Sequence, residues 1–336
     1  MITGPGAGGV AEVASPHPES DEVVVEVSKV GICGTDRELF EGSMPYLADG
    51  NARYPLRIGH EWVGRVVDAG AGVDPSWLGQ RVTGDTILGC NMCARCASGR
   101  AHVCAVRFEI GVRGGWPGAL AERLPVPVSA LHAVPDSIDD TSAAMIEPAG
   151  NAWRAFAGTA VGPGERLLIL GPGTIGLLRA MFARAAGAEV HLLGRADRSL
   201  HFAGTLGFDG VWTRRTLPNL EWHGVIDASS ASEFPGLAID LVEPGRRVAL
   251  VGLAASAGNV DTRTIVLKDV TIVGVLGASG GFVPVIDSFA SGAVDPRPLV
   301  SAIVGLEETT GALSGIPRPD TGPGPKTLVD LKRRRR

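Results

Sequence analysis

The chain has 336 residues, 45% of them hydrophobic, and a formal net charge of −5 at pH 7. A chain of this length usually divides into two domains, and its negative charge argues against nucleic acid or an anionic membrane as a partner. No apolar run reaches the roughly 20 residues of a membrane span, and the first ten residues lack the basic start of a signal peptide, so we expect a cytoplasmic protein.

The region before residue 155 is predicted to be a compact β-rich domain. Valine-rich stretches at 21–30 and 61–68 alternate with segments broken by glycine and proline, which is the pattern of short strands joined by turns. Residues 1–4 are enough for only a short first strand. We therefore expect a frayed edge at the N-terminus.

Several side chains in this region are of the kinds that bind a catalytic zinc ion. Cys33 lies in the segment Gly-Ile-Cys-Gly-Thr-Asp, His60 is followed by Glu61, and Glu147 precedes a proline. A thiolate, an imidazole and a carboxylate can hold zinc with a fourth position free. Each also has an ordinary alternative role: Cys33 as a small buried side chain, His60 as a hydrogen-bonded core residue, Glu147 as a surface acid. Spacing alone does not join them.

A dense cysteine cluster lies between these residues in the sequence. Its pattern is C-x2-C-x2-C-x7-C, formed by Cys90, Cys93, Cys96 and Cys104. Four thiolates at this spacing predict a closed tetrahedral site for a structural zinc ion. An iron–sulfur cluster also takes four cysteines, although the ferredoxin runs are spaced differently. Disulfides suit short secreted chains better than a chain of this size.

After residue 155 the pattern changes to an alternation of strands and helices. Strands are predicted at 166–170, 189–193, 224–227, 247–253 and 270–275, and helices at 175–188 and, after the second strand, through residue 206. This alternation predicts a parallel sheet covered on both faces. Residues 326–331 are predicted to form one last strand after a linker-like segment at 315–325. We interpret the arginine run at 333–336 as a short solvated tail.

The first strand–helix turn of this later region carries the motif G-x-G-x-x-G. Its members are Gly171, Gly173, Thr174, Ile175 and Gly176, directly after a predicted strand and opening a predicted helix. The first glycine permits the tight turn, the second lets a pyrophosphate approach the backbone, and the third allows close strand–helix packing. Because the helix N-terminus also faces the phosphates, we predict a dinucleotide site rather than a turn that serves packing alone.

The end of the second strand predicts which dinucleotide is bound. NAD-selective sites place an acid there, about 20 residues past the glycines, to bond the ribose 2′-hydroxyl. Gly194 occupies that position in this chain, and Arg195 and Arg198 follow it. Room for a 2′-phosphate and arginines to pair with it favour NADP. NAD is the alternative, with both arginines solvated and Asp197 in the role of the acid, although Asp197 comes late in the sequence for that role.

The ordered set of these motifs resembles the zinc-dependent medium-chain alcohol dehydrogenases, within them the polyol and aldose dehydrogenases, and the match covers nearly the whole chain. The resemblance implies an α/β fold with two domains. A GroES-like β-rich catalytic domain at 1–154 is completed by 295–336, and a Rossmann domain with a doubly wound parallel sheet lies at 155–294. It also implies one catalytic and one structural zinc ion and a homodimer or homotetramer.

By position, the resemblance assigns Cys33 and His60 as catalytic zinc ligands, with Glu61 and Glu147 sharing the remaining role. One of these carboxylates binds the metal directly and the other acts through water, and the sequence does not decide which. Thr35 matches the residue that relays the alcohol proton. Glu38 stands where many members have a relay histidine, and we expect it either to accept a bond from a sugar hydroxyl or to pair with a basic residue such as Arg37.

These assignments predict hydride transfer between NADP and a secondary alcohol, namely a polyol, an aldose or a cyclitol. Trp62, Trp116 and Asn151 are candidate pocket residues from their closeness in sequence to the ligand motifs, with a core role equally open for either tryptophan. The segment 302–321 departs from the family pattern and is expected to reshape the cleft. The alternatives are a reductase of an activated double bond or imine, and a non-catalytic zinc-binding protein on the same scaffold.

Overall fold

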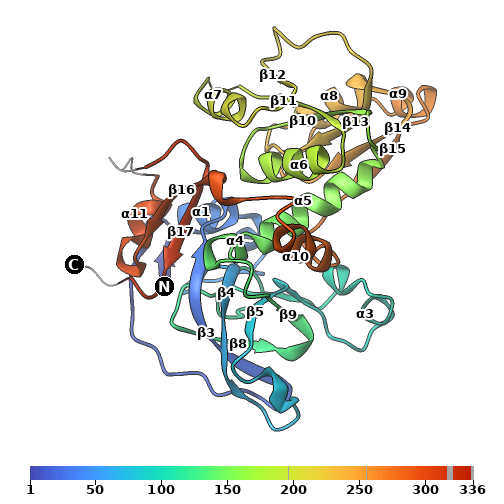
Figure 1. Cartoon of the computed structure of the whole chain (residues 1–336). Coiled ribbons are helices and arrows are strands. Elements are labelled where there is room, and N and C mark those ends of the chain that lie inside the picture. The colour runs from blue at the N-terminus through green and yellow to red at the C-terminus, as the bar shows by residue number, and fades with distance from the viewer. Residues whose placement is uncertain (196, 255, 316–320, 334–336) are drawn as a thin grey trace.

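The computed structural model describes residues 1–195, 197–254, 256–315 and 321–333, and Figure 1 shows two bodies connected through the helix α5 (Ile146–Thr159). The first body is built on a seven-stranded sheet in which β16-β17-β3-β4-β5-β9 follow one another and β8 pairs with β3. Its strands are β3 (Glu22–Gly31), β4 (Glu61–Ala69), β5 (Arg81–Gly84), β8 (Arg123–Pro127), β9 (Leu131–Ala133), β16 (Val300–Val304) and β17 (Lys326–Asp330). The prediction of a β-rich N-terminal region is confirmed.

Shorter elements surround this sheet. The helices are α1 (Gly34–Glu41), α2 (Pro45–Ala48), α3 (Ala94–Ala97), α4 (Asp140–Ala143) and α11 (Thr309–Leu313). Two small hairpins complete the body: β1 (Ile2–Gly4) with β2 (Ala7–Gly8), and β6 (Ile87–Leu88) with β7 (Phe108–Glu109). The cysteine-rich lobe extends from the second hairpin, around α3 (Figure 1).

The second body is a six-stranded parallel sheet in the order β12-β11-β10-β13-β14-β15. Its strands are β10 (Arg166–Leu170), β11 (Glu189–Leu193), β12 (Gly210–Trp212), β13 (Trp222–Asp227), β14 (Val242–Leu250) and β15 (Thr271–Gly274). Its helices are α6 (Thr174–Ala185), α7 (Asp197–Thr205), α8 (Phe234–Leu241), α9 (Thr262–Leu267) and α10 (Phe282–Ala290). The predicted alternation of strands and helices is confirmed.

Alternate side chains of β10 explain why both faces of this sheet are covered. Leu167 and Ile169 belong to a buried cluster with residues of α5, α6 and α10. Leu168 and Leu170 point the other way, into a cluster with residues of α8. A parallel strand that is buried on both faces is apolar at every position instead of at every second one, which is the pattern that β10 shows.

The chain returns to the first sheet at its end. β17 pairs antiparallel with β3, so that Leu328 lies opposite Gly31, and β16 extends the sheet in parallel beside β17. The predicted last strand is therefore confirmed. Part of the segment expected to reshape the cleft, 316–320, lies outside the described residues, as does the arginine tail from 334 onward. The division into domains at 154/155 and 294/295 stays a prediction, and α5 runs through the first of these points.

The expected frayed edge at the N-terminus was wrong, and of the two roles open for Trp62 the structure shows the core role. The N-terminal edge is not frayed: Ile2 is 3% exposed, and its backbone exchanges hydrogen bonds of 2.8 Å in both directions with Leu56. Trp62 lines no substrate pocket but is fully buried in the core of the first sheet, between valines of β3 and β5. A large apolar side chain on the inner face of a central strand packs into the core. Within the described ranges, no helix is both long and apolar enough to cross a membrane.

Candidate functional site

Strand pairing brings a thiol, an imidazole and a carboxylate together at one end of β3 and β4. Gly31, the last residue of β3, lies opposite Glu61, the first residue of β4. Cys33 just beyond β3 therefore comes next to His60 just ahead of β4. One ligand atom from each of Cys33, His60 and Glu61 lies within 4.8 Å of the other two. His60 and Glu61 are buried, at 6% and 1% exposure, whereas Cys33 is partly exposed, so this polar site is closed on the side of β4 and open to solvent at the thiol.

Asp36 holds the cluster in shape from the first turn of α1. Its carboxylate accepts hydrogen bonds from the backbone N–H of Cys33 at 2.9 Å and of Gly59 at 3.1 Å, and lies 3.6 Å from His60 Nδ1. Burial alone would raise the pKa of Asp36, but the neighbouring imidazole and these N–H donors lower it below its ordinary value. The same carboxylate, working against burial, raises the pKa of His60 well above its ordinary value. Asp36 thus lies where the outer partners of metal-binding histidines are commonly found, although His60 Nδ1 makes no hydrogen bond with any described residue.

Lys326 reaches the same cluster from the last strand. Its ammonium group donates to Glu61 Oε2 and, at 2.9 Å, to the backbone carbonyl of Ile32. Lys326 and Glu61 are 2% and 1% exposed. A side chain at Gly31 would put its Cβ 2.0 Å from Glu61 Oε2 and 2.8 Å from the lysine Cε, so the pair needs glycine there. Sequence reasoning missed Lys326, whose only signal is a lysine at the start of an apolar strand.

Glu147 lies beside the cluster but outside the group of three. It enters the site from the first turn of α5, and its Oε1 accepts a 3.2 Å hydrogen bond from the Thr86 hydroxyl. Burial, opposed by the charge of His60 and aided by the charges of Glu61 and Asp85, raises the pKa of Glu147 to about 7. Of the two predicted carboxylates, the structure therefore places Glu61 with the thiol and imidazole, and Glu147 next to them.

Thr35 and Glu38 belong to α1, the helix that starts directly after Cys33. Both are partly exposed. The expected ion pair of Glu38 with Arg37 or another basic residue is not formed within the described part of the chain. Burial and then the nearby Glu41 raise the pKa of Glu38, so this carboxyl group is free to accept or donate a hydrogen bond.

The four cysteines of the lobe converge. Sγ–Sγ distances are 3.5 Å for Cys93 and Cys96, 3.9 Å for Cys93 and Cys104, and 4.0 Å for Cys90 and Cys96. All four thiols lie within 4.8 Å of one another, and none forms a disulfide. Backbone N–H groups of Met92 and Cys93 lower the pKa of Cys90 to about 6. A shell of four sulfur donors, one of them ionised at neutral pH, fits a tetrahedral zinc ion.

The glycine motif has the geometry of a phosphate-binding turn. Gly171 directly follows the strand β10 with φ of 104°, a conformation that favours glycine, and Gly173 is the N-cap of α6. At Gly176 a Cβ would lie 2.0 Å from the carbonyl oxygen of Gly171. Thr174 and Ile175 form the first turn of α6, so their N–H groups face the turn, where phosphate oxygens bind.

Gly176→Ala is expected to weaken coenzyme binding by an order of magnitude or more, about 1.4 kcal/mol for each factor of ten. The added methyl cannot be accommodated without moving the backbone of Gly171, which opens the turn. Titration calorimetry with NADP and NAD measures the effect. Gly204→Ala is the matched control, because nothing lies within 4 Å of a Cβ built there. Unchanged affinity in the first variant would mean that the turn does not hold the phosphates.

The three residues predicted to select NADP lie in different surroundings. Gly194 is buried, and a Cβ there would lie 2.8 Å from the ring of Pro172 and 2.9 Å from Leu200, so an acid at this position would have to displace them. Arg195 is exposed and lies 4.0 Å from Glu233. Arg198 lines a cavity of about 440 Å³ between the two bodies. The structure thus brings Arg198, but not Arg195, to this interdomain cavity.

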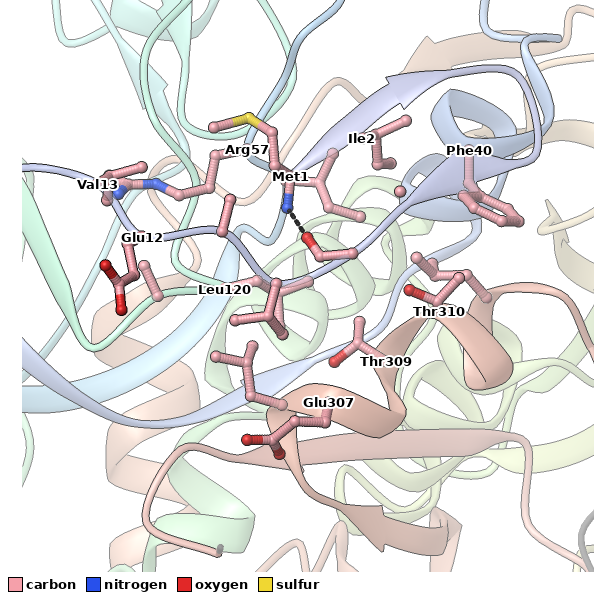
Figure 2. Close-up of a pocket in the computed structure, with 18 of the residues that line it drawn as sticks. Met1, Ile2, Glu12, Val13, Phe40, Arg57, Leu120, Glu307, Thr309 and Thr310 are labelled. Atoms are coloured by element: carbon pink, nitrogen blue, oxygen red, sulfur yellow. Dashed lines mark hydrogen bonds between the residues drawn. The ribbon is translucent and has the colours of Figure 1, made fainter. Parts of the chain in front are cut away.

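A second cavity, of about 420 Å³, is shown in Figure 2. It lies between residues 8–13, the end of α1 and the region around Thr309, with Arg57 and Leu120 in its wall. None of Cys33, His60 and Glu61 lines it. The remaining predicted pocket residues do not line it either: the Trp116 indole donates to the carbonyl of Pro125, and the Asn151 amide accepts from Arg179.

Comparison with known protein families gives two matches. Residues 19–136 match the alcohol dehydrogenase GroES-like domain, and residues 174–291 match the zinc-binding dehydrogenase domain. Among characterised sequences, the chain is 33% identical to L-threonine 3-dehydrogenase of Saccharopolyspora erythraea, over 80% of both chains. It is 31% identical to sorbitol dehydrogenase of Halalkalibacterium halodurans, over 81% of both.

Solved structures share the whole fold. One is described as a short chain alcohol dehydrogenase from Escherichia coli CFT073, in complex with NADH; it is 26% identical, covers 98% of both chains and has a TM-score of 0.89. Another, a zinc-binding dehydrogenase from Sinorhizobium meliloti 1021 bound to NADP, is 26% identical with a TM-score of 0.87, over 98% of this chain and 97% of that one. Both forms of the coenzyme therefore occur among the structural relatives.

Proposed function

Because this chain belongs to the family of zinc-dependent medium-chain dehydrogenases, we propose that it transfers a hydride between NADP and a secondary alcohol of a polyhydroxylated compound. The observation that carries the proposal is the trio of the partly exposed Cys33 with the buried His60 and Glu61, whose ligand atoms lie within 4.8 Å of one another. The family establishes an NAD(P)-dependent oxidoreductase. The choice of NADP as coenzyme and of a polyol, aldose or cyclitol as substrate goes beyond the family and is proposed here.

The donor set fits a catalytic zinc ion. A thiol, an imidazole and a carboxylate are the protein ligands of such sites, which keep a fourth position open for water or substrate. Cys33, His60 and Glu61 would hold the metal, with Glu147 close enough to act through water. When bound, zinc polarises the substrate oxygen and stabilises the negative charge that develops on it. The lobe cysteines would hold a second, structural ion.

The residues of the chain have separate tasks in this proposal. Asp36 holds the backbone beside the cluster in place through its hydrogen bonds with Cys33 and Gly59, and its negative charge lies next to the His60 ring. The Thr35 hydroxyl accepts the proton of the alcohol and passes it toward solvent, since it lies two residues after Cys33 on a partly exposed turn. Glu38, one turn further along α1 and without a partner among the described residues, is placed to accept a hydrogen bond from another substrate hydroxyl.

Relatives support the class of substrate. The two characterised sequences are named for sorbitol and for L-threonine, and both compounds carry a secondary hydroxyl group with polar neighbours. An additional carboxyl group close to the metal trio, Glu147, favours a substrate with several hydroxyl groups over a simple apolar alcohol. We also propose a cytoplasmic location, because reducing conditions keep the lobe thiols available for metal. We further propose that the protein is a homodimer or homotetramer.

Turnover tests the proposal directly. The zinc-loaded protein is mixed with NADP or NAD and a panel of polyols, aldoses, cyclitols and simple secondary alcohols, and formation of reduced nicotinamide is followed by absorbance. We expect turnover of a polyhydroxylated alcohol with NADP, lost on chelation. Thr35→Ala is expected to lower kcat by roughly two orders of magnitude or more, the range for removal of a proton-transfer group. Thr3→Ala is the control, because it removes an exposed hydroxyl group near the N-terminus.

Two outcomes would favour the alternatives. Reduction of an activated double bond or imine that persists in Thr35→Ala would point to a reductase, because that chemistry depends less on a proton relay to a substrate oxygen. Zinc binding without any affinity for either nucleotide would point to a non-catalytic zinc-binding protein. The intact glycine turn argues against this second alternative, since a Cβ at Gly176 is excluded by contact with Gly171.

A further inference from the structure

The interdomain cavity has a cationic wall that the glycine turn alone does not explain. Arg198 enters it from the first turn of α7, and Arg37 enters it from α1 of the other body. Neither guanidinium group makes a hydrogen bond or ion pair with any described residue. Pro172, the second residue of the glycine motif, also lines the cavity, so the cavity opens beside the turn expected to hold the coenzyme phosphates.

The rest of the lining favours an anion. Its polar members are hydroxyl-bearing residues, and its apolar members are small or ring-shaped: Ser199, Phe202, Ser301, Ala302, Ala312, Gly315, Thr321, Pro323, Gly324, Pro325 and Thr327. No carboxylate is present among the described residues of the lining. Two arginines that have no partner among the described residues line one cavity, one from each body, and their like charges favour an anion in it. Arginine guanidinium groups pair best with phosphate, through parallel hydrogen bonds.

We propose that Arg37, from the first body, is a coenzyme-binding residue. Together with Arg198 it binds a phosphate group of the dinucleotide in this cavity. The inference rests on the proposed function for the identity of the ligand. Figure 1 shows that the helices carrying the two arginines lie on facing sides of the two bodies. Helix α7 lies on the side of the parallel sheet that faces β16 and α11, and α1 lies next to β16 and α11. The phosphate would then bridge the two bodies, so that binding of the coenzyme also draws them together.

Of these two arginines, only Arg198 could be assigned from the sequence. Arg198 follows the strand whose end is known to read the ribose, so its role is predictable from its position. Arg37 is far away in the sequence, on a helix associated with the metal ligands, and only the return of the C-terminal segment brings its helix to the cavity.

Calorimetry with fragments of the coenzyme tests the inference. Full-length, zinc-loaded wild type, Arg37→Gln and Arg198→Gln are titrated with 2′,5′-ADP and, separately, with inorganic pyrophosphate. Each variant is expected to weaken binding of at least one probe roughly tenfold or more, the scale of one lost charge-assisted pair. Loss confined to 2′,5′-ADP identifies the 2′-phosphate as the group gripped, and loss of pyrophosphate binding identifies the bridging phosphates.

Matched controls separate the site from general charge effects. Arg123→Gln and Arg214→Gln remove exposed arginines, one from each body, that line none of the cavities described above, and both are expected to leave binding unchanged. Wild-type affinity of both probes for Arg37→Gln, or no binding of either probe to wild type, overturns the inference. Turnover with NADP at an unchanged KM in Arg37→Gln would overturn it while leaving the proposed function intact. Probe binding that depends on Arg37, in a protein that turns over no alcohol, would support the inference and contradict the proposed function.

Discussion

Cys33→Ser is expected to reduce turnover by three orders of magnitude or more and to lower the zinc content by one ion per chain. Serine keeps the volume of the side chain but offers a hydroxyl in place of a thiolate, and zinc prefers sulfur, nitrogen and carboxylate donors. Loss of the ion removes the group that stabilises the charge on the substrate oxygen, a contribution of several kcal/mol to the transition state. Atomic emission gives the zinc content, and hydride transfer to NADP gives the turnover.

Cys104→Ser serves as the control for metal loss elsewhere. Cys104 is buried in the lobe, and its replacement is expected to release the other zinc ion and lower the thermal midpoint. Cys104 does not belong to the trio of Cys33, His60 and Glu61, so protein that stays folded should retain turnover. A Cys33→Ser protein that binds its full zinc and turns over substrate at the wild-type rate would show that the trio does not hold the catalytic metal.

The architecture could be predicted because the family motifs and the alternation of strands and helices are both visible in short segments of the sequence. β10 and β11 begin and end at the predicted residues, since a doubly buried parallel strand is a continuous apolar run bounded by turn residues. The glycine motif was recognisable for a similar reason, as the turn itself requires glycine at Gly171 and Gly176. Trp62 shows the limit of closeness in sequence: it follows the metal ligands directly, yet strand alternation turns its indole into the core.

Contacts between distant segments could not be predicted in this way. Lys326 pairs with Glu61 across almost the whole length of the chain, because β17 returns to lie beside β3. A lysine that opens an apolar strand gives no sign of which acid it meets. The choice between Glu61 and Glu147 was open for the same reason, because it depends on the register of β3 with β4 and on where α5 enters the site.

Lys326→Met is expected to destabilise the protein by about 3 to 5 kcal/mol, the usual cost of leaving a buried charge without its partner. The variant keeps most of the side-chain volume but removes both hydrogen bonds of the ammonium group, to Glu61 and to Ile32. The carboxylate of Glu61 then stays buried, at 1% exposure, with no cation beside it unless a metal ion takes that place. Urea denaturation of the metal-free protein therefore measures the full effect.

A second ion pair on the same strand is the matched control. Lys29 and Asp330 lie 2.5 Å apart but are 15% and 24% exposed, so Lys29→Met is expected to cost at most about 1 kcal/mol. Adding Glu61→Gln to Lys326→Met removes the orphaned charge and should recover part of the stability without restoring turnover. Zinc should stabilise Lys326→Met more than wild type if the metal binds Glu61, because the ion then supplies the missing positive charge. Equal urea midpoints for Lys326→Met and Lys29→Met would mean that the buried pair contributes no more than the partly exposed one.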